Sequence, residues 1–225
     1  MPKLMNFELY VLVSFTLLLQ LVSAGCAFDP DNSGHVEIPS TWTNIAQSAF
    51  YLCSAMTSLS FESGSQLTSI GDGAFQQSGL SGNVVFPSSV TTVGGNIVRD
   101  CTSPTLSLSF ENGCKLSSLQ KESFYGAPLS GTITLGASLT SIPDRAFYKT
   151  SGTYSIVFET GSQLQSIGHS AFAQAPTQTD GGLSGNLVLP ASLLTISDSA
   201  FFNQGTFSLS FESGSQLTSI GDGAF

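Results

Sequence analysis

The sequence predicts a repeat solenoid of about eight stacked units, and three observations predict it. Residues 58–75 recur letter for letter as residues 208–225. An Ala-Phe pair or its equivalent closes a unit every 23 to 29 residues, and a short run of alternating apolar and polar residues opens each unit. Because a fixed period of this length is typical of repeat architectures, we expect each unit to bury its apolar face against its neighbours.

The predicted solenoid spans residues 34–225, with units ending near residues 50, 75, 98, 124, 147, 172, 201 and 225. The aromatic residues that close the units are expected to stack in one buried column: Phe50, Phe75, Phe124, Phe147, Phe172 and Phe201. The third unit carries Ile97 and Val98 in place of Ala-Phe, so we expect looser packing there.

Each unit is expected to contain a short strand followed by a short turn. In the run SLSFE, Leu59 and Phe61 share one face while Ser60 lies on the other, which is the alternation of a half-buried strand. An aspartate recurs two residues after an isoleucine, where it could cap a single helical or 3-10 turn. These aspartates are Asp72, Asp144, Asp198 and Asp222.

The segments LTSIGDGAF, LQSIGHSAF and LTSIPDRAF, each preceded by a predicted strand, resemble the BspA-like class of leucine-rich repeats. The resemblance covers about residues 34–225. It implies a leucine-rich-repeat-like right-handed horseshoe, with a parallel β-sheet on one face and the short helical or 3-10 turns on the other. It also implies an extracellular or cell-surface protein that acts in adhesion or ligand binding.

Residues 1–24 are predicted to be a signal peptide. Lys3 precedes an apolar run over residues 9–22, and small residues end at Ala24. The run is shorter than the ~20 residues that span a bilayer, so it predicts a secreted or cell-surface chain without a membrane span. A buried N-terminal helix and a lipid anchor at Cys26 are the alternatives. Residues 25–33 are then expected to form an N-terminal cap.

The charge of the chain argues against nucleic acid as a partner. Six Lys and Arg stand against 15 Asp and Glu, which gives a net charge of −9. A phosphate backbone would be repelled by this excess of carboxylates.

The four cysteines predict at most one disulfide. Cys53 and Cys101 occupy the same slot two units apart, about 10 Å at a strand spacing of about 4.8 Å, so they should not pair. Cys26 could join the cap to Cys53, with free buried thiols as the alternative. Cys114 replaces a turn serine and is expected to be exposed. The absence of a CxxC motif argues against structural zinc.

No catalytic constellation is visible, so we expect neither an enzyme nor a cofactor. The two histidines, His35 and His169, have no obvious partners. Residues 29–37 begin like a calcium loop, but its twelfth position is Ser40 instead of glutamate, and no metal site is expected.

The candidate binding residues lie on the exposed sheet face and in one long loop. The central column of the face includes Val85, Thr134, Val157 and Val188, and the adjacent column carries Glu62, Glu111, Glu159 and Glu212. The loop that lengthens one unit contains Thr177, Gln178 and Asp180. The glutamates could instead be solvated groups that keep the sheet from associating edge to edge.

These features favour an extracellular binding or adhesion module for an unidentified protein or glycan. The alternative is a structural or surface-coat repeat protein without a discrete ligand site, including one with an ice-ordering face. The second copy of the 18-residue segment leaves Leu217, Ile220 and Phe225 facing water, so we also expect that the chain belongs to a longer repeat array.

Overall fold

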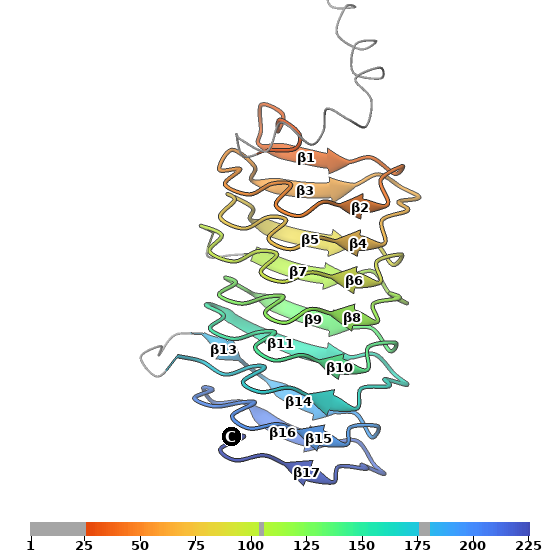
Figure 1. Cartoon of the computed structure of the whole chain (residues 1–225), viewed down its shortest axis with the longest axis vertical. Coiled ribbons are helices and arrows are strands. Elements are labelled where there is room, and N and C mark those ends of the chain that lie inside the picture. Colours follow the sequence, from red (N-terminus) through yellow and green to blue (C-terminus); the bar gives the residue numbers. More distant parts are fainter. Residues whose placement is uncertain (1–25, 104–105, 176–180) are drawn as a thin grey trace, which may run out of the picture.

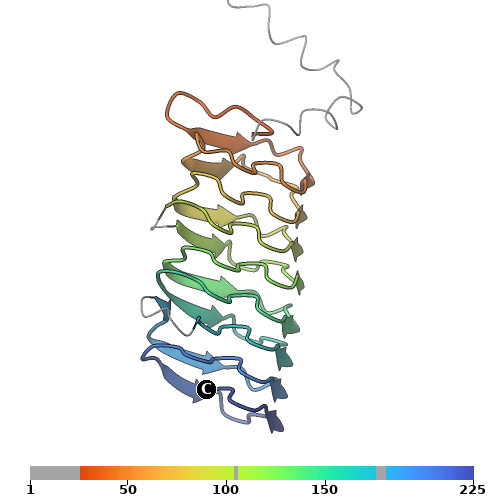
Figure 2. The same ribbon diagram turned by 60° about the vertical axis from the view of Figure 1, so that its left-hand side comes forward.

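The computed structural model describes residues 26–103, 106–175 and 181–225. The chain winds into a stack of coils along one axis, and two views of the stack show the coils following one another in sequence order (Figures 1 and 2). The prediction of a repeat solenoid with parallel strands is therefore confirmed. The predicted signal peptide lies outside the described residues.

Each coil contributes one strand to each of two rows. The row of longer strands, called the broad face here, comprises β1 (His35–Ile38), β3 (Ser58–Phe61), β5 (Gly82–Phe86), β7 (Leu106–Phe110), β9 (Gly131–Leu135), β11 (Thr153–Phe158), β14 (Asn186–Leu189) and β16 (Ser208–Phe211), with β13 (Gly182–Leu183) beside β11. The row of two-residue strands comprises β2 (Asn44–Ile45), β4 (Ser69–Ile70), β6 (Thr92–Val93), β8 (Ser118–Leu119), β10 (Ser141–Ile142), β12 (Ser166–Ile167), β15 (Thr195–Ile196) and β17 (Ser219–Ile220).

All pairings between strands are parallel and place equivalent residues side by side. On the broad face the paired groups are β1-β3, β5-β7, β13-β11-β9 and β14-β16, and the short strands form β2-β4-β6-β8 and β10-β12-β15-β17. Val157 pairs with Thr134, and Ile70 pairs with both Ile45 and Val93. Equivalent side chains therefore form columns along the solenoid axis.

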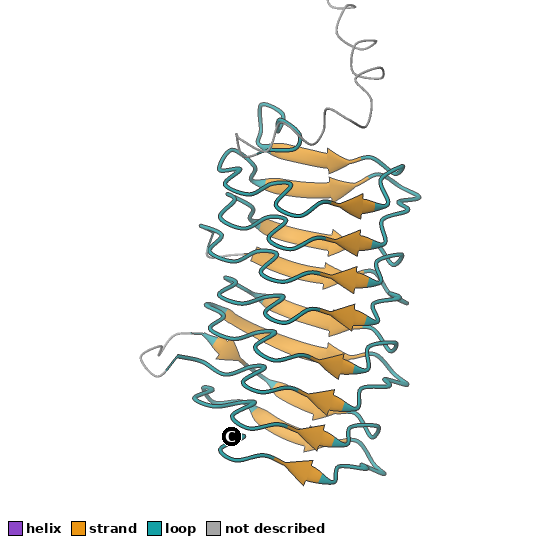
Figure 3. Ribbon diagram, in the orientation of Figure 1, coloured by secondary structure: helices purple, strands orange, loops and turns teal. Residues whose placement is uncertain are grey.

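The predicted helical or 3-10 face is wrong, because the described residues contain strands and loops but no helix (Figure 3). Left-handed residues interrupt the segment around each column phenylalanine; in the fifth coil they are Arg145 (φ 56°) and Lys149 (φ 57°). An L-residue in this conformation cannot continue a right-handed helix. The intervening Phe147 N–H instead donates to the Ala171 carbonyl of the next coil at 2.7 Å.

The aspartates also connect coils rather than capping helical turns. Asp72 Oδ1 accepts a hydrogen bond from the Gly95 N–H of the following coil at 2.8 Å. Asp144 Oδ1 accepts one from the His169 N–H at 2.9 Å. Side chains and backbone thus build a third ladder between coils, beside the two rows of strands.

The column phenylalanines are fully buried in the core, but they form two stacks. Phe50 and Phe75 have ring centroids 5.4 Å apart. The second stack runs through Phe124, Phe147, Phe172 and Phe201 at centroid spacings of 4.9, 5.1 and 5.1 Å. Between the stacks, Ile97 and Val98 are fully buried and fill the core of the third coil with aliphatic side chains.

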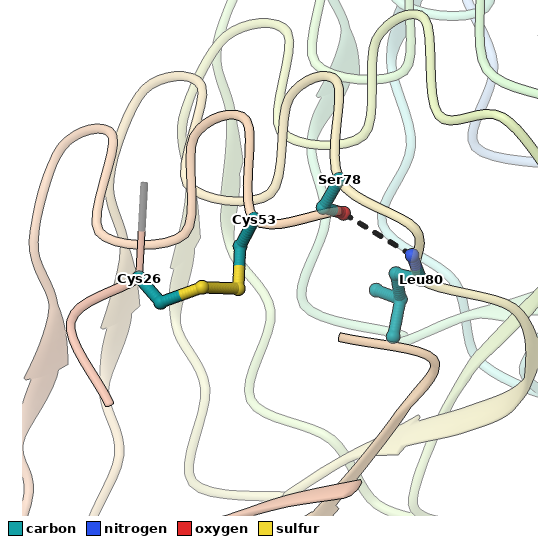
Figure 4. Close-up of a disulfide and its surroundings, with 4 residues drawn as sticks. All are labelled: Cys26, Cys53, Ser78 and Leu80. Carbon is teal, nitrogen blue, oxygen red and sulfur yellow. Dashed lines mark hydrogen bonds between the residues drawn. A yellow bond between two sulfur atoms is a disulfide. The ribbon is translucent and has the colours of Figure 1, made fainter. Parts of the chain in front are cut away.

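A disulfide between Cys26 and Cys53 ties the N-terminal segment to the first coil (Figure 4). The Ala27 N–H donates to the Ala49 carbonyl at 2.7 Å, and the rings of Phe28 and Trp42 lie 5.2 Å apart. These contacts hold the segment against the outer side of the first coil.

Cys101 and Cys114 are free thiols, and both are buried. The expectation that Cys114 is exposed is wrong. Its turn is covered by the next coil, where a Cβ on Gly136 would lie 2.6 Å from the Cys114 carbonyl oxygen. Burial raises the pKa of both thiols.

Candidate binding surfaces

The central column of the broad face carries three exposed valines. Val85, Val157 and Val188 are 41, 46 and 41% exposed, while Thr134 is partly exposed beside Val157. Their neighbours in register carry hydroxyl groups: Val85 pairs with Ser109, Val157 with Thr134, and Val188 with Ser210. The column is therefore a line of small apolar and hydroxyl side chains on a hydrogen-bonded backbone.

The four glutamates of the adjacent column share one contact with the preceding coil. In each, a carboxylate oxygen accepts a backbone N–H bond from the turn that follows the preceding broad strand. The pairs are Glu62 with Ser40 at 2.8 Å, Glu111 with Ser88 at 2.8 Å, Glu159 with Ala137 at 3.3 Å, and Glu212 with Ala191 at 2.9 Å. These side chains satisfy turn N–H groups, so each has a structural contact in addition to any binding role.

Glu62 makes a second bond in this arrangement. The Ser40 hydroxyl donates to the same Glu62 oxygen at 3.0 Å. Hydrogen bonds from the Ser40 backbone and side chain lower the pKa of Glu62, because both stabilise the charged form. The sequence signal for this role was present: a glutamate follows the strand at the same slot in alternate units.

The long-loop candidates Thr177, Gln178 and Asp180 lie outside the described residues. Side chains of the following coil bind the backbone on both sides of the loop. The Asn203 amide donates to the Ala175 carbonyl at 2.7 Å, and Gln204 Oε1 accepts a bond from the Leu183 N–H at 2.7 Å.

The histidines occupy separate surroundings. His35 lies on the broad face, with Nδ1 2.9 Å from Ser58 Oγ and Nε2 3.0 Å from Ser60 Oγ. His169 is exposed in a turn, and its Nε2 lies 3.2 Å from Ser170 Oγ. In the described ranges, no group of three or more His, Cys, Asp or Glu side chains could hold a metal ion.

A set of turn residues was overlooked because only the sheet columns were considered. Tyr51, Tyr125, Tyr148 and Phe202 each follow a column phenylalanine directly, so the repeat aligns them on one side of the solenoid. Tyr51 and Phe202 are exposed, and Tyr125 and Tyr148 are partly exposed. The same slot-by-slot reading that found the sheet columns would have found this one.

The family model described as "BspA type Leucine rich repeat region" matches in six copies, over residues 14–105, 68–180 and 184–225. A comparison with curated proteins finds no match. Nor does any helix in the described portion of the chain have the length and apolar character needed to cross a membrane.

Three solved structures are similar to the chain. A leucine-rich repeat protein from Bacteroides ovatus ATCC 8483 superposes with a TM-score of 0.65 at 23% identity, over 85% of this chain and 46% of that protein. The chain thus spans about half the length of that relative, and the likeness shows the fold. The pneumococcal vaccine antigen PcpA gives a TM-score of 0.46 at 19% identity, over 86% of this chain and 70% of that one. A leucine rich cell surface protein from Faecalibacterium prausnitzii A2-165 gives 0.25 at 17% identity, over 83 and 78%.

Proposed function

Because the chain belongs to the family of BspA-type leucine-rich repeat proteins, we propose that it is an extracellular or cell-surface module that binds a protein or glycan through its broad face. The apolar N-terminal run of the sequence supports secretion.

The observation that carries the proposal is the line of exposed valines Val85, Val157 and Val188. These β-branched side chains stand on strands whose backbone is fixed by pairing with the neighbouring coils. A ligand that covered them would bury apolar surface without ordering a flexible loop, which reduces the entropic cost of association. The shortage of charge along this central column also suits the middle of an interface.

The proposal is tested with the secreted chain on a printed glycan array and on a panel of purified extracellular-matrix proteins. We expect binding to at least one member, and Val157→Lys should weaken it about tenfold by placing a charge in the contact. Gln165→Lys is the matched control, because it adds the same charge at an exposed position outside the broad face. Binding that Val157→Lys leaves unchanged would contradict the proposal. Thermal hysteresis in a chain that binds nothing would favour the ice-ordering alternative.

A further inference from the structure

Most of the positive charge of this acidic chain lies in one small area. Four of the six Lys and Arg residues belong to the turn segments of three consecutive coils, between a short strand and the next broad strand. Two tyrosines lie among them. We call this set the turn-side patch: Arg99, Lys121, Tyr125, Arg145, Tyr148 and Lys149.

Three of the four cations of the patch, Arg99, Arg145 and Lys149, lie against the tyrosine rings. The Tyr125 and Tyr148 ring centroids are 5.6 Å apart. Arg99 Cζ lies 4.8 Å above the Tyr125 ring centroid. Arg145 Cζ and Lys149 Nζ lie 5.6 and 5.3 Å from the Tyr148 centroid. Attraction between a cation and the ring face orients these groups before any ligand arrives.

The positive charge of the patch is only partly neutralised. Arg99 Nε lies 3.3 Å from Asp100, and Arg145 lies 3.5 Å from Glu122; these are the two ion pairs between side chains of the described residues. Asp144 lies in the same turn segments as Asp100 and Glu122, so four cations and three carboxylates leave one net positive charge. The Arg99 Nε atom itself is buried, and its contact with Asp100 lacks hydrogen-bond geometry, so this contact is an ion pair alone.

The turns themselves do not require long cationic side chains. Arg145 and Lys149 both have left-handed φ angles, near 56° and 57°. Equivalent slots in other coils have left-handed φ angles too, and they hold side chains of every kind: Leu52, Gly73, Gln77, Glu122, Ser199 and Asn203. The turn geometry therefore does not by itself select the cationic side chains of Arg145 and Lys149.

We propose that the turn-side patch binds an acidic polysaccharide. Carboxylate or sulfate groups of the polymer pair with the guanidinium groups of Arg99 and Arg145 and with the Lys149 ammonium, while sugar rings lie against the tyrosines. The patch runs across three coils along the solenoid axis, which suits a linear polymer with a charge repeated along its length. It contains no aliphatic side chain to anchor a folded protein, and this favours a glycan. The patch is separate from the broad face. A failed test of the patch would therefore leave the proposed binding through the broad face untouched, and the reverse also holds.

The test measures binding of the secreted chain to polygalacturonate, to dextran sulfate and to neutral dextran by isothermal titration at low salt. We expect binding to at least one acidic polymer and none to neutral dextran, with affinity falling as salt is added. The carboxylated and sulfated arms identify which anion the site prefers. Polyglutamate and single-stranded DNA complete the panel, and a preference for either over both acidic polysaccharides would overturn the proposal.

Variants locate the site. The double substitution Arg145→Gly and Lys149→Gly removes two cations and suits the left-handed backbone, so we expect the Kd to rise about tenfold or more while the unfolding midpoint changes little. Lys115→Gln is the matched control, because Lys115 lies in the turn between β7 and β8, at another corner of its coil. Equal weakening by Lys115→Gln would show diffuse charge attraction and overturn the site, as would a double variant that binds like the parent.

Discussion

Residues 58–75 and 208–225 have the same sequence, but the structure buries them very differently. In the first copy Ile70 is 1% and Phe75 0% exposed. In the second copy the equivalent Ile220 is 53% and Phe225 56% exposed. Burial in this molecule is thus not a property of the local sequence.

The difference follows from the number of neighbouring coils. Phe75 stacks on Phe50, and its N–H donates to the Ile97 carbonyl of the following coil at 2.8 Å. Phe225 stacks on Phe201 of the preceding coil at 5.3 Å, and no later coil among the described residues covers its other side. The sequence of a unit specifies its path, whereas a second neighbour completes its burial.

The largest effect should be the difference in stability between alanine variants of Phe75 and Phe225, the equivalent phenylalanines of the two copies. Phe75→Ala opens a cavity between coils and is expected to lower the free energy of unfolding by about 3–5 kcal/mol. Phe225→Ala removes a ring that is already half in water, so we expect a loss below about 1 kcal/mol. Denaturant unfolding of both variants measures this difference. Equal losses would contradict the account based on neighbouring coils.

Removing the disulfide between Cys26 and Cys53 should have a smaller effect on stability. This disulfide ties the N-terminal segment to the first coil, which is the coil before the first copy. Cys26 and Cys53 are separated by 27 residues, and closing a loop of this length stabilises a fold by about 3.5 kcal/mol in the chain-entropy account. We expect Cys26→Ser with Cys53→Ser to lower the stability by about this amount and to increase amide exchange around Phe50 more than around Phe201.

Reductant supplies the control for the disulfide. Added to the parent chain, it should reproduce the effect of the double variant, and it should leave the double variant itself unchanged. A parent whose thermal unfolding does not respond to reductant would show that the N-terminal segment is held by Phe28, Trp42 and backbone contacts alone.

The repeat and its columns could be predicted because they depend on slot-by-slot periodicity. The alternation that placed Leu59 inward and Ser60 outward also fixed which residues of neighbouring strands face each other. The short strands could not be predicted, since two residues such as Ser69 and Ile70 are too few to show a period. Nor could the helix-breaking turns, because left-handed residues such as Arg145 are not glycines.

The candidate sites also differ in whether the sequence could predict them. The valine column was visible in the sequence as an alternation, and its binding role stays a prediction. The second role of the glutamates was missed because the partner of Glu62 is a backbone N–H in another coil, at Ser40. The turn-side patch was missed because Arg99, Tyr125 and Tyr148 meet only when three units are stacked.

The smallest effect should distinguish the glutamates of the two identical copies. Glu62 accepts hydrogen bonds from both the Ser40 N–H and the Ser40 hydroxyl, whereas Glu212 accepts one from the Ala191 N–H, because alanine has no hydroxyl. The preceding coil, not the copy itself, sets the number of bonds. Ser40→Ala should therefore leave Glu62 with a single hydrogen bond, from the backbone N–H of residue 40, as Glu212 has from Ala191.

The pH dependence gives the measurement. The pKa of Glu62 is lowered in the folded state. The larger cause is the hydrogen bond from the Ser40 backbone N–H, and the smaller is the bond from the Ser40 hydroxyl. Its contribution to stability is thus present above the unfolded pKa of about 4.3 and is lost as pH falls through the folded value. In Ser40→Ala, NMR titration of the Glu62 carboxyl carbon should show the pKa moving up toward the ordinary value, and Ala191→Ser is the reciprocal variant at Glu212. A Glu62 pKa that does not move in Ser40→Ala would rule out the hydroxyl as a cause and leave the backbone bond as the whole interaction.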